Sequence, residues 1–143
     1  MRIAVVGSRG QLGAAVVSEC SADHEVVALD RCALDVTDDR AVASTMARIK
    51  PDAIVNCAAY NDVDGAEDHP VEALNVNAFA VRALARAAAE LNATLVQFST
   101  DFVFDGTKTM PYTEEDRPNP RSVYATSKLV GEWLAADGSG PYC

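Results

Sequence analysis

Four short hydrophobic runs recur along the chain, separated by longer segments of mixed polarity. Each run is rich in β-branched residues, a composition typical of strands that are buried in a parallel sheet. The runs are RIAVV (2–6), EVVAL (25–29), AIVN (53–56) and TLVQF (94–98). We therefore expect four strands with their side chains largely buried.

The segments between these runs have the periodicity of helices. They cover 11–21, 38–49 and 71–91. The last contains the alanine-rich run ALARAAAEL, which favours a helix that can pack closely on a sheet. Strands and helices that alternate through short links form right-handed βαβ units. The pattern predicts an α/β fold, a Rossmann-like doubly wound parallel sheet.

A glycine-rich segment, VVGSRGQLG, joins the first predicted strand to the first predicted helix. Gly7, Gly10 and Gly13 are spaced three apart. Glycine allows a tight turn and a close approach of the backbone to a pyrophosphate, which the helix N-terminus attracts. Asp30 follows the second strand, where a carboxylate can accept hydrogen bonds from an adenosine ribose. A plain turn and a loop carboxylate are the alternatives, but this order of elements indicates a dinucleotide site.

The choice between NAD and NADP stays open. Asp30 would repel a ribose 2′-phosphate, whereas Arg9 and Arg31 would attract one. Two further segments, LDVTD (34–38) and NCAAY (56–60), follow strands at the rim where ligands bind in open parallel sheets. The small residues and the acid in these segments are expected to border the cofactor, namely Asp35, Val36, Ala58 and Ala59.

Composition and charge narrow the class of protein. The chain has 143 residues, of which 49% are hydrophobic and 23% charged, as in an ordinary globular domain. The net charge of −9 argues against a nucleic-acid partner. The apolar run IAVV is too short for a signal peptide or a membrane span, so we expect a cytoplasmic protein. The four cysteines are scattered, which predicts neither a zinc site nor a disulfide framework.

The segment SVYATSKLVGEW (122–133) places Tyr124 and Lys128 on one face of a predicted helix. A solvated face is the simpler interpretation. Leu129, Val130, Trp133 and Leu134 form an apolar stripe roughly opposite that face. By itself, the pair does not establish catalysis.

Four motifs together resemble the extended short-chain dehydrogenase/reductase superfamily. They are GSRGQLG, NCAAYNDVDGAE, FSTDFVFDG and YATSKLVGE. The chain is most similar to the dTDP-4-dehydrorhamnose reductase branch, and the likeness runs through nearly all of its length. STDFVFDG followed by PYTEEDRPNPRSVYATSK is the most discriminating part.

The resemblance implies that Thr100, Tyr124 and Lys128 are catalytic. NADPH or NADH would deliver a hydride to a 4-keto-6-deoxy sugar linked to dTDP, and Tyr124 would protonate the alkoxide. A neighbouring cation lowers the pKa of a phenol, a role that suits Lys128. Thr100 would donate a hydrogen bond to the same oxygen. Two alternatives are a noncatalytic dinucleotide-binding regulatory subunit and a nucleotide-sugar epimerase or dehydratase.

The resemblance also implies a set of cofactor contacts. They are Gly7, Arg9, Gly10, Gln11, Leu12, Asp30, Arg31, Asp35, Val36, Ala58, Ala59, Tyr60, Asn77, Tyr124 and Lys128. Asn77 has two equal interpretations, an organiser of the site or a helix-surface amide. Ala15 stands where some members carry a metal-binding glutamate, so no metal is expected. A nucleotide-sugar substrate is the expected partner, and a homodimer is one arrangement that the resemblance allows.

The end of the chain departs from the family, whose members run about twice as long. We expect residues 1–143 to be an incomplete NAD(P)-binding domain that stops before the later strands and the substrate lobe. The final GSGPYC would then begin a fifth strand. An unpaired fourth strand would be exposed, and the fragment would be weak or inactive as a reductase.

Overall fold

The structure, a computed structural model, describes residues 1–138 and contains one four-stranded parallel sheet. Its strands are β1 (Arg2–Val6), β2 (Glu25–Leu29), β3 (Ala53–Asn56) and β4 (Thr94–Gln97). The order β2-β1-β3-β4 confirms the predicted α/β, doubly wound fold. Val6 pairs with both Leu29 and Asn56, so three strands end at the same level.

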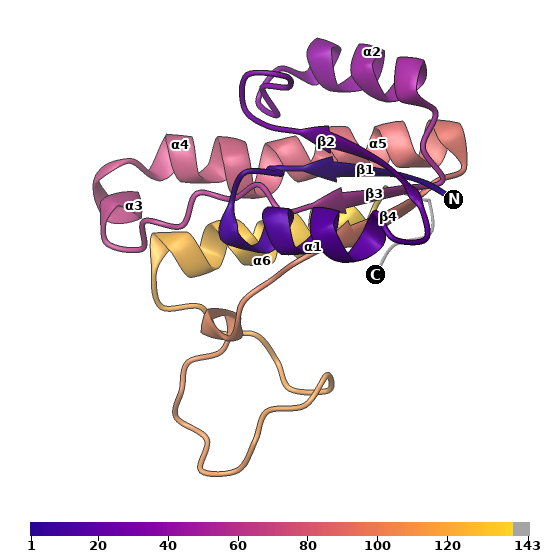
Figure 1. The fold of residues 1–143 in the computed structure, drawn as a ribbon. Coiled ribbons are helices and arrows are strands. Elements are labelled where there is room, and N and C mark those ends of the chain that lie inside the picture. Colours follow the sequence, from indigo (N-terminus) through magenta and orange to yellow (C-terminus); the bar gives the residue numbers. More distant parts are fainter. Residues whose placement is uncertain (139–143) are drawn as a thin grey trace.

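Helices cover both faces of the sheet (Figure 1). α1 (Gln11–Cys20) packs on one face, where Val16 and Val17 contact Ile3 and Val5. α2 (Asp39–Ile49) and α5 (Ala80–Leu91) pack on the other face. The chain moves from β1 to β2 in one direction and from β2 through β3 to β4 in the other, so right-handed crossovers require this division.

The predicted single helix over 71–91 is interrupted. α4 (Pro70–Leu74) is followed by a π-helical turn, η1 (Asn75–Phe79), before α5 begins. A short helix, α3 (Gly65–Asp68), precedes them. The turn buries Asn77, and its side chain bonds to another segment of the protein, which a surface position on a regular helix would not allow. π-Helical turns of this kind are frequent at functional sites.

α6 (Val123–Ala136) follows a long connection that begins with the 3₁₀ turn η2 (Asp101–Val103). The predicted stripe of apolar residues is wrong for Trp133, which is 60% exposed, whereas Lys128 on the opposite side is buried. The reason is that α6 packs against η1 and α5 through small residues, including Ala125 and Gly131. The Tyr124 and Lys128 side of α6 is therefore not a solvated face.

Within residues 1–138, β4 is an edge strand that pairs with β3 alone. The start of a fifth strand is expected in GSGPYC (138–143). Residues 139–143 of this segment lie outside the described residues. No helix in the described part of the chain combines the length and the apolar character that a membrane span requires.

Candidate dinucleotide and catalytic site

A cleft of about 680 Å³ lies at the carboxyl ends of β1 and β3. The strand order changes direction between these two strands, and this point of an open parallel sheet is where ligands bind. The loops after β1, β2 and β3 all contribute to its walls. The cleft has the size of a typical small-molecule or cofactor site.

Most of the residues predicted to contact a dinucleotide line this cleft. They are Gly7, Arg9, Gly10, Asp30, Arg31, Asp35, Val36, Ala58, Ala59 and Tyr60. Gln11 and Leu12 begin α1 beside the cleft but are not among its lining residues. Asn77, Tyr124 and Lys128 lie outside the lining as well, so the structure does not place the predicted catalytic residues in the same pocket as the predicted dinucleotide contacts.

The glycine loop depends on close backbone packing. Gly7 has φ +75°, a left-handed conformation that favours glycine. A Cβ on Gly13 would lie 2.3 Å from the carbonyl oxygen of Gly7, so any side chain there would push the loop away from α1. The loop is closed by the Gly10 N–H, which donates to the Gly7 carbonyl at 3.0 Å.

The start of α1 fits a bound pyrophosphate. Its N-cap residue, Gly10, provides no side-chain hydrogen bond to the first turn. By contrast, Asp38 caps α2 and Ser122 caps α6 with side-chain oxygens. The first-turn N–H groups of α1 are therefore available to an anionic ligand at the positive end of the helix dipole. These backbone groups explain how Gln11 and Leu12 could contact a cofactor.

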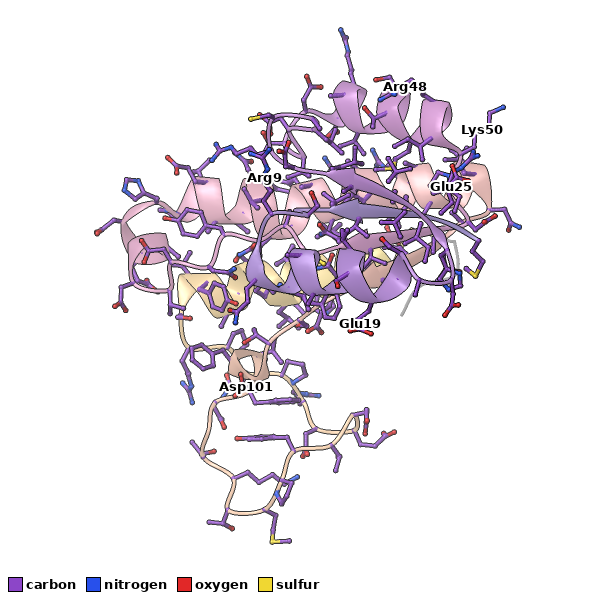
Figure 2. All side chains as sticks on the ribbon, viewed as in Figure 1. Arg9, Glu19, Glu25, Arg48, Lys50 and Asp101 are labelled. Atoms are coloured by element: carbon purple, nitrogen blue, oxygen red, sulfur yellow. The ribbon has the colours of Figure 1, made fainter. Side chains whose placement is uncertain are left out.

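Asp30 is positioned by its own loop and by an arginine. Its Oδ1 accepts hydrogen bonds from the N–H groups of Cys32 and Ala33, at 3.0 and 2.9 Å. Its Oδ2 forms an ion pair with Arg9 Nε at 2.9 Å. Arg9 extends from the glycine loop and its side chain is 83% exposed (Figure 2). A carboxylate and a guanidinium thus lie together in one wall of the cleft.

Sequence reasoning missed part of the lining. The missed residues are Val6, Leu34, Thr37, Cys57, Asn61, Glu72, Asn75 and Val76. Thr37, Cys57 and Asn61 lie in or beside segments already singled out, so strand-end position could have found them. Glu72, Asn75 and Val76 come from α4 and η1, and no local signal indicated that this helix reaches the cleft.

Asn77 is 2% exposed and connects the cleft to α6. Its Oδ1 accepts a hydrogen bond from the Tyr60 N–H at 2.8 Å, and its Nδ2 donates to the Tyr60 carbonyl at 3.1 Å. Nδ2 also donates to Ser127 Oγ at 2.9 Å, and Ser127 Oγ donates to the Tyr124 carbonyl at 2.7 Å. Of the two interpretations of Asn77, the structure supports the organiser. Its amide reaches the cleft through Tyr60.

Lys128 is 6% exposed and joins α6 to the end of β4. Its Nζ donates a hydrogen bond to the Phe98 carbonyl at 2.7 Å. Burial lowers the pKa of Lys128, and the Glu132 carboxylate one turn later acts in the opposite direction. Glu132 also accepts a hydrogen bond from Ser99 Oγ. Two side chains of α6 therefore hold the segment that leads directly to Thr100.

Thr100 and Tyr124 belong to two elements that contact each other, η2 and α6. Thr100 is the N-cap of η2, where its Oγ1 accepts a long hydrogen bond of 3.3 Å from the Phe102 N–H. The Tyr124 ring packs edge-on against the Phe102 ring, with centroids 6.2 Å apart. The structure thus gathers Thr100, Tyr124 and Lys128 at the carboxyl end of β4, the strand beside the cleft.

This fold and cleft define a nucleotide-binding α/β domain of the Rossmann type, with a Tyr and a Lys of one helix beside the sheet end. The family can be named from sequence comparison. A profile described as the RmlD substrate binding domain matches residues 1–140. The chain belongs to this family, as its resemblance to dTDP-4-dehydrorhamnose reductases predicted.

Known relatives agree with this assignment. The chain is 46% identical over 139 residues to the dTDP-4-dehydrorhamnose reductase of Sinorhizobium fredii, covering 97% of the chain and 47% of the relative. The crystal structure of a Clostridium acetobutylicum dTDP-4-dehydrorhamnose reductase is similar with a TM-score of 0.97 and 38% identity, covering 99% of this chain and 51% of that one. The Bacillus anthracis enzyme in complex with NADP has a TM-score of 0.96 and 34% identity, covering 99% and 50%. The chain spans about half the length of these relatives.

Proposed function

We propose that the protein is an NAD(P)H-dependent reductase that converts dTDP-4-dehydro-6-deoxy-L-mannose to dTDP-L-rhamnose. One observation carries the proposal: the Lys128 bond to the Phe98 carbonyl fixes the Tyr-x-x-x-Lys helix at the end of β4, the strand that pairs with β3, and the loop after β3 lines the glycine-containing cleft. The relatives named as dTDP-4-dehydrorhamnose reductases support the choice of substrate. Residues 1–143 would form the dinucleotide-binding part of that enzyme.

The cleft supports binding of the dinucleotide at three places. The free N–H groups at the start of α1 would hold the pyrophosphate. Asp30 and Arg9 would meet the adenosine ribose or its 2′-phosphate. Tyr60, held by Asn77, and the small residues Ala58 and Ala59 would form the wall opposite. The bound nicotinamide would supply the hydride.

Residues of this chain would supply the proton that the reaction needs. Reduction of a ketone adds a hydride to carbon and leaves negative charge on the carbonyl oxygen, which needs a proton. Tyr124 would donate that proton from its phenol, and the buried ammonium of Lys128 on the same helix face would favour the resulting phenolate. Thr100 would donate a hydrogen bond to the same oxygen as its charge develops.

Turnover of the full protein with a 4-keto-6-deoxy sugar nucleotide tests this proposal, with reduced nicotinamide followed by its absorbance. Tyr124→Phe removes the proton donor and should lower kcat by roughly 10²–10⁴-fold, while binding of the dinucleotide is unchanged. A regulatory subunit would bind the dinucleotide and show no turnover in the unmodified protein. Near-normal turnover of Tyr124→Phe would refute the assigned role.

A matched pair of threonine variants isolates the second catalytic role. Thr100→Val should lower kcat by roughly tenfold or more because one donor to the developing oxyanion is lost. Thr126→Val is the control, since the Thr126 hydroxyl on α6 donates only to the Ser122 carbonyl within the helix. Equal rates for the two variants would exclude Thr100 from the reaction.

A further inference from the structure

The segment between η2 and α6 projects from the body of the protein as a long loop (Figure 1). It leaves the body close to Asp101, which Figure 2 labels at the junction, and returns at Ser122, the N-cap of α6. Loops of this length without regular structure are uncommon in compact domains and are usually functional. This loop connects the turn that carries Thr100 to the helix that carries Tyr124.

One carboxylate, Asp105, collects donors from three parts of this loop. Its Oδ1 accepts hydrogen bonds from Thr107 N and Oγ1, at 3.0 and 2.8 Å, and from the Tyr112 hydroxyl at 2.8 Å. Its Oδ2 accepts from Asn119 Nδ2 at 2.9 Å and lies 3.8 Å from Arg121 Nη2. The bond from the Thr107 N–H, followed by that from Asn119, holds the pKa of Asp105 well below its usual range.

These bonds join the departing and returning ends of the loop at its base. Next to the Asp105 bond, the Asn119 N–H donates to the Val103 carbonyl at 2.8 Å. Val103 is 5% exposed, and its own N–H donates to the Thr100 carbonyl at 3.3 Å. Two residues beyond Asn119, the chain reaches Arg121 and then α6. The base of the loop therefore sets how η2 sits relative to the start of α6.

The same junction includes the tyrosine. Phe102, in the middle of η2, packs edge-on against the Tyr124 ring. A shift of η2 relative to α6 would move that contact and the Thr100 hydroxyl together. In enzymes, a misplacement of about 1 Å at the reacting groups can cost roughly 10²-fold in rate.

We propose that Asp105 is a positioning residue, which fixes Thr100 relative to Tyr124 by tying together the two ends of the connecting loop. It does not touch the reacting atoms. The inference rests on the proposed function for its effect on turnover, but its structural content does not depend on that function. It gives Asp105, the second aspartate of the STDFVFDG motif, a role that a simple turn cap would not have.

The same loop offers a matched control. Asp116 is also a loop aspartate with three donors, Lys108 Nζ at 2.5 Å, Thr113 N at 2.8 Å and Thr113 Oγ1 at 3.2 Å. All three donors belong to the outer part of the loop. Asp116 therefore organises the tip, whereas Asp105 organises the base.

Three variants of the full protein test the proposal. Asp105→Asn keeps the shape but replaces one of the two acceptor oxygens with an amide donor and removes the charge beside Arg121, so kcat should fall by roughly 10–100-fold with the dissociation constant for reduced dinucleotide unchanged. Adding Asn119→Asp restores a donor–acceptor pair with its polarity reversed and should recover most of the lost kcat. Asp116→Asn should leave kcat within about twofold. Equal losses in Asp105→Asn and Asp116→Asn, or no recovery in the double variant, would overturn the proposal.

Hydrogen exchange of the same proteins supplies a readout without turnover. Asp105→Asn should speed exchange at 100–104 and 119–124, and Asp116→Asn only at 108–116. If the unmodified protein reduces no keto sugar, the proposed function fails while this pattern still tests the base of the loop. Unchanged exchange at 100–104 in Asp105→Asn would overturn the positioning role whatever the activity.

Discussion

The ammonium of Lys128 donates a hydrogen bond to the backbone carbonyl of Phe98 at 2.7 Å, which joins α6 to the end of β4. The two residues are 30 positions apart in the sequence. The bond places a buried titratable cation at the end of β4. The group for which we propose a catalytic role thus also contributes to the packing of α6, and its effects on turnover and on stability can be measured separately.

Lys128→Met should abolish most turnover and yet increase the free energy of unfolding at neutral pH by about 1 kcal/mol. Burial lowers the pKa of Lys128 from 10.5, so the unfolded chain binds this proton more strongly than the folded chain does. The unmodified protein should therefore gain stability as pH rises from the lowered pKa towards 10.5, whereas the variant should not. Urea unfolding of both proteins at several pH values measures the difference. If the variant's advantage in free energy of unfolding over the unmodified protein grew with rising pH, this account would be contradicted.

Gly13→Ala should destabilise the fold by roughly 2 kcal/mol and remove dinucleotide binding. The added Cβ would lie 2.3 Å from the Gly7 carbonyl oxygen, and the nearest atoms that it would meet, in Gly7 and Ser8, all belong to the backbone. Gly10→Ala is the graded comparison, because its Cβ would lie 3.3 Å from the same oxygen and requires only a small adjustment. Thermal unfolding and titration with reduced nicotinamide check both variants. A Gly10→Ala protein less stable than Gly13→Ala would show that close packing does not govern this loop.

Asn77→Ala should lower the free energy of unfolding by roughly 1–3 kcal/mol, because it leaves the partly buried backbone N–H and carbonyl of Tyr60 without their partner. It should also weaken dinucleotide binding, since Tyr60 lines the cleft. Ser127→Ala removes the link from Asn77 to α6 and the bond within α6 to the Tyr124 carbonyl, but it keeps both bonds between Asn77 and Tyr60, so dinucleotide affinity should be unchanged. Calorimetric titration of the two variants with the dinucleotide separates the effects. Equal affinities would mean that Tyr60 does not need the amide of Asn77.

Arg9→Ala should weaken NADPH binding by roughly tenfold and leave NADH binding nearly unchanged. The change removes a cation for the 2′-phosphate and frees the Asp30 carboxylate that Arg9 pairs at 2.9 Å, so repulsion is added to the lost attraction. Arg48→Ala is the control, because Arg48 lies on α2, away from Arg9 (Figure 2). Dissociation constants for both cofactors measure the selectivity. A parallel loss for NADH and NADPH would show that Arg9 does not distinguish them.

Much of the cleft could be predicted because its determinants are local. The glycine spacing after β1 and the acid after β2 are set by a turn and by the ends of adjacent strands, and ten of the predicted contacts line the cleft. The organiser role of Asn77 could not be chosen from sequence. Its partners Tyr60 and Ser127 are 17 and 50 residues away along the chain, and a regular helix pattern gives no sign of the π-helical turn.

By itself, the sequence determined the α/β alternation, the parallel sheet and the glycine loop at the start of α1, because hydrophobic periodicity and backbone conformation depend on neighbouring residues. Only the tertiary structure decided which face of α6 is buried. Apolar periodicity favoured a solvated Tyr124 and Lys128 face, but Lys128 is buried and Trp133 is exposed. The physical reason is that small residues let α6 approach η1 closely, and the Lys128 ammonium then bonds to a carbonyl 30 residues earlier in the chain.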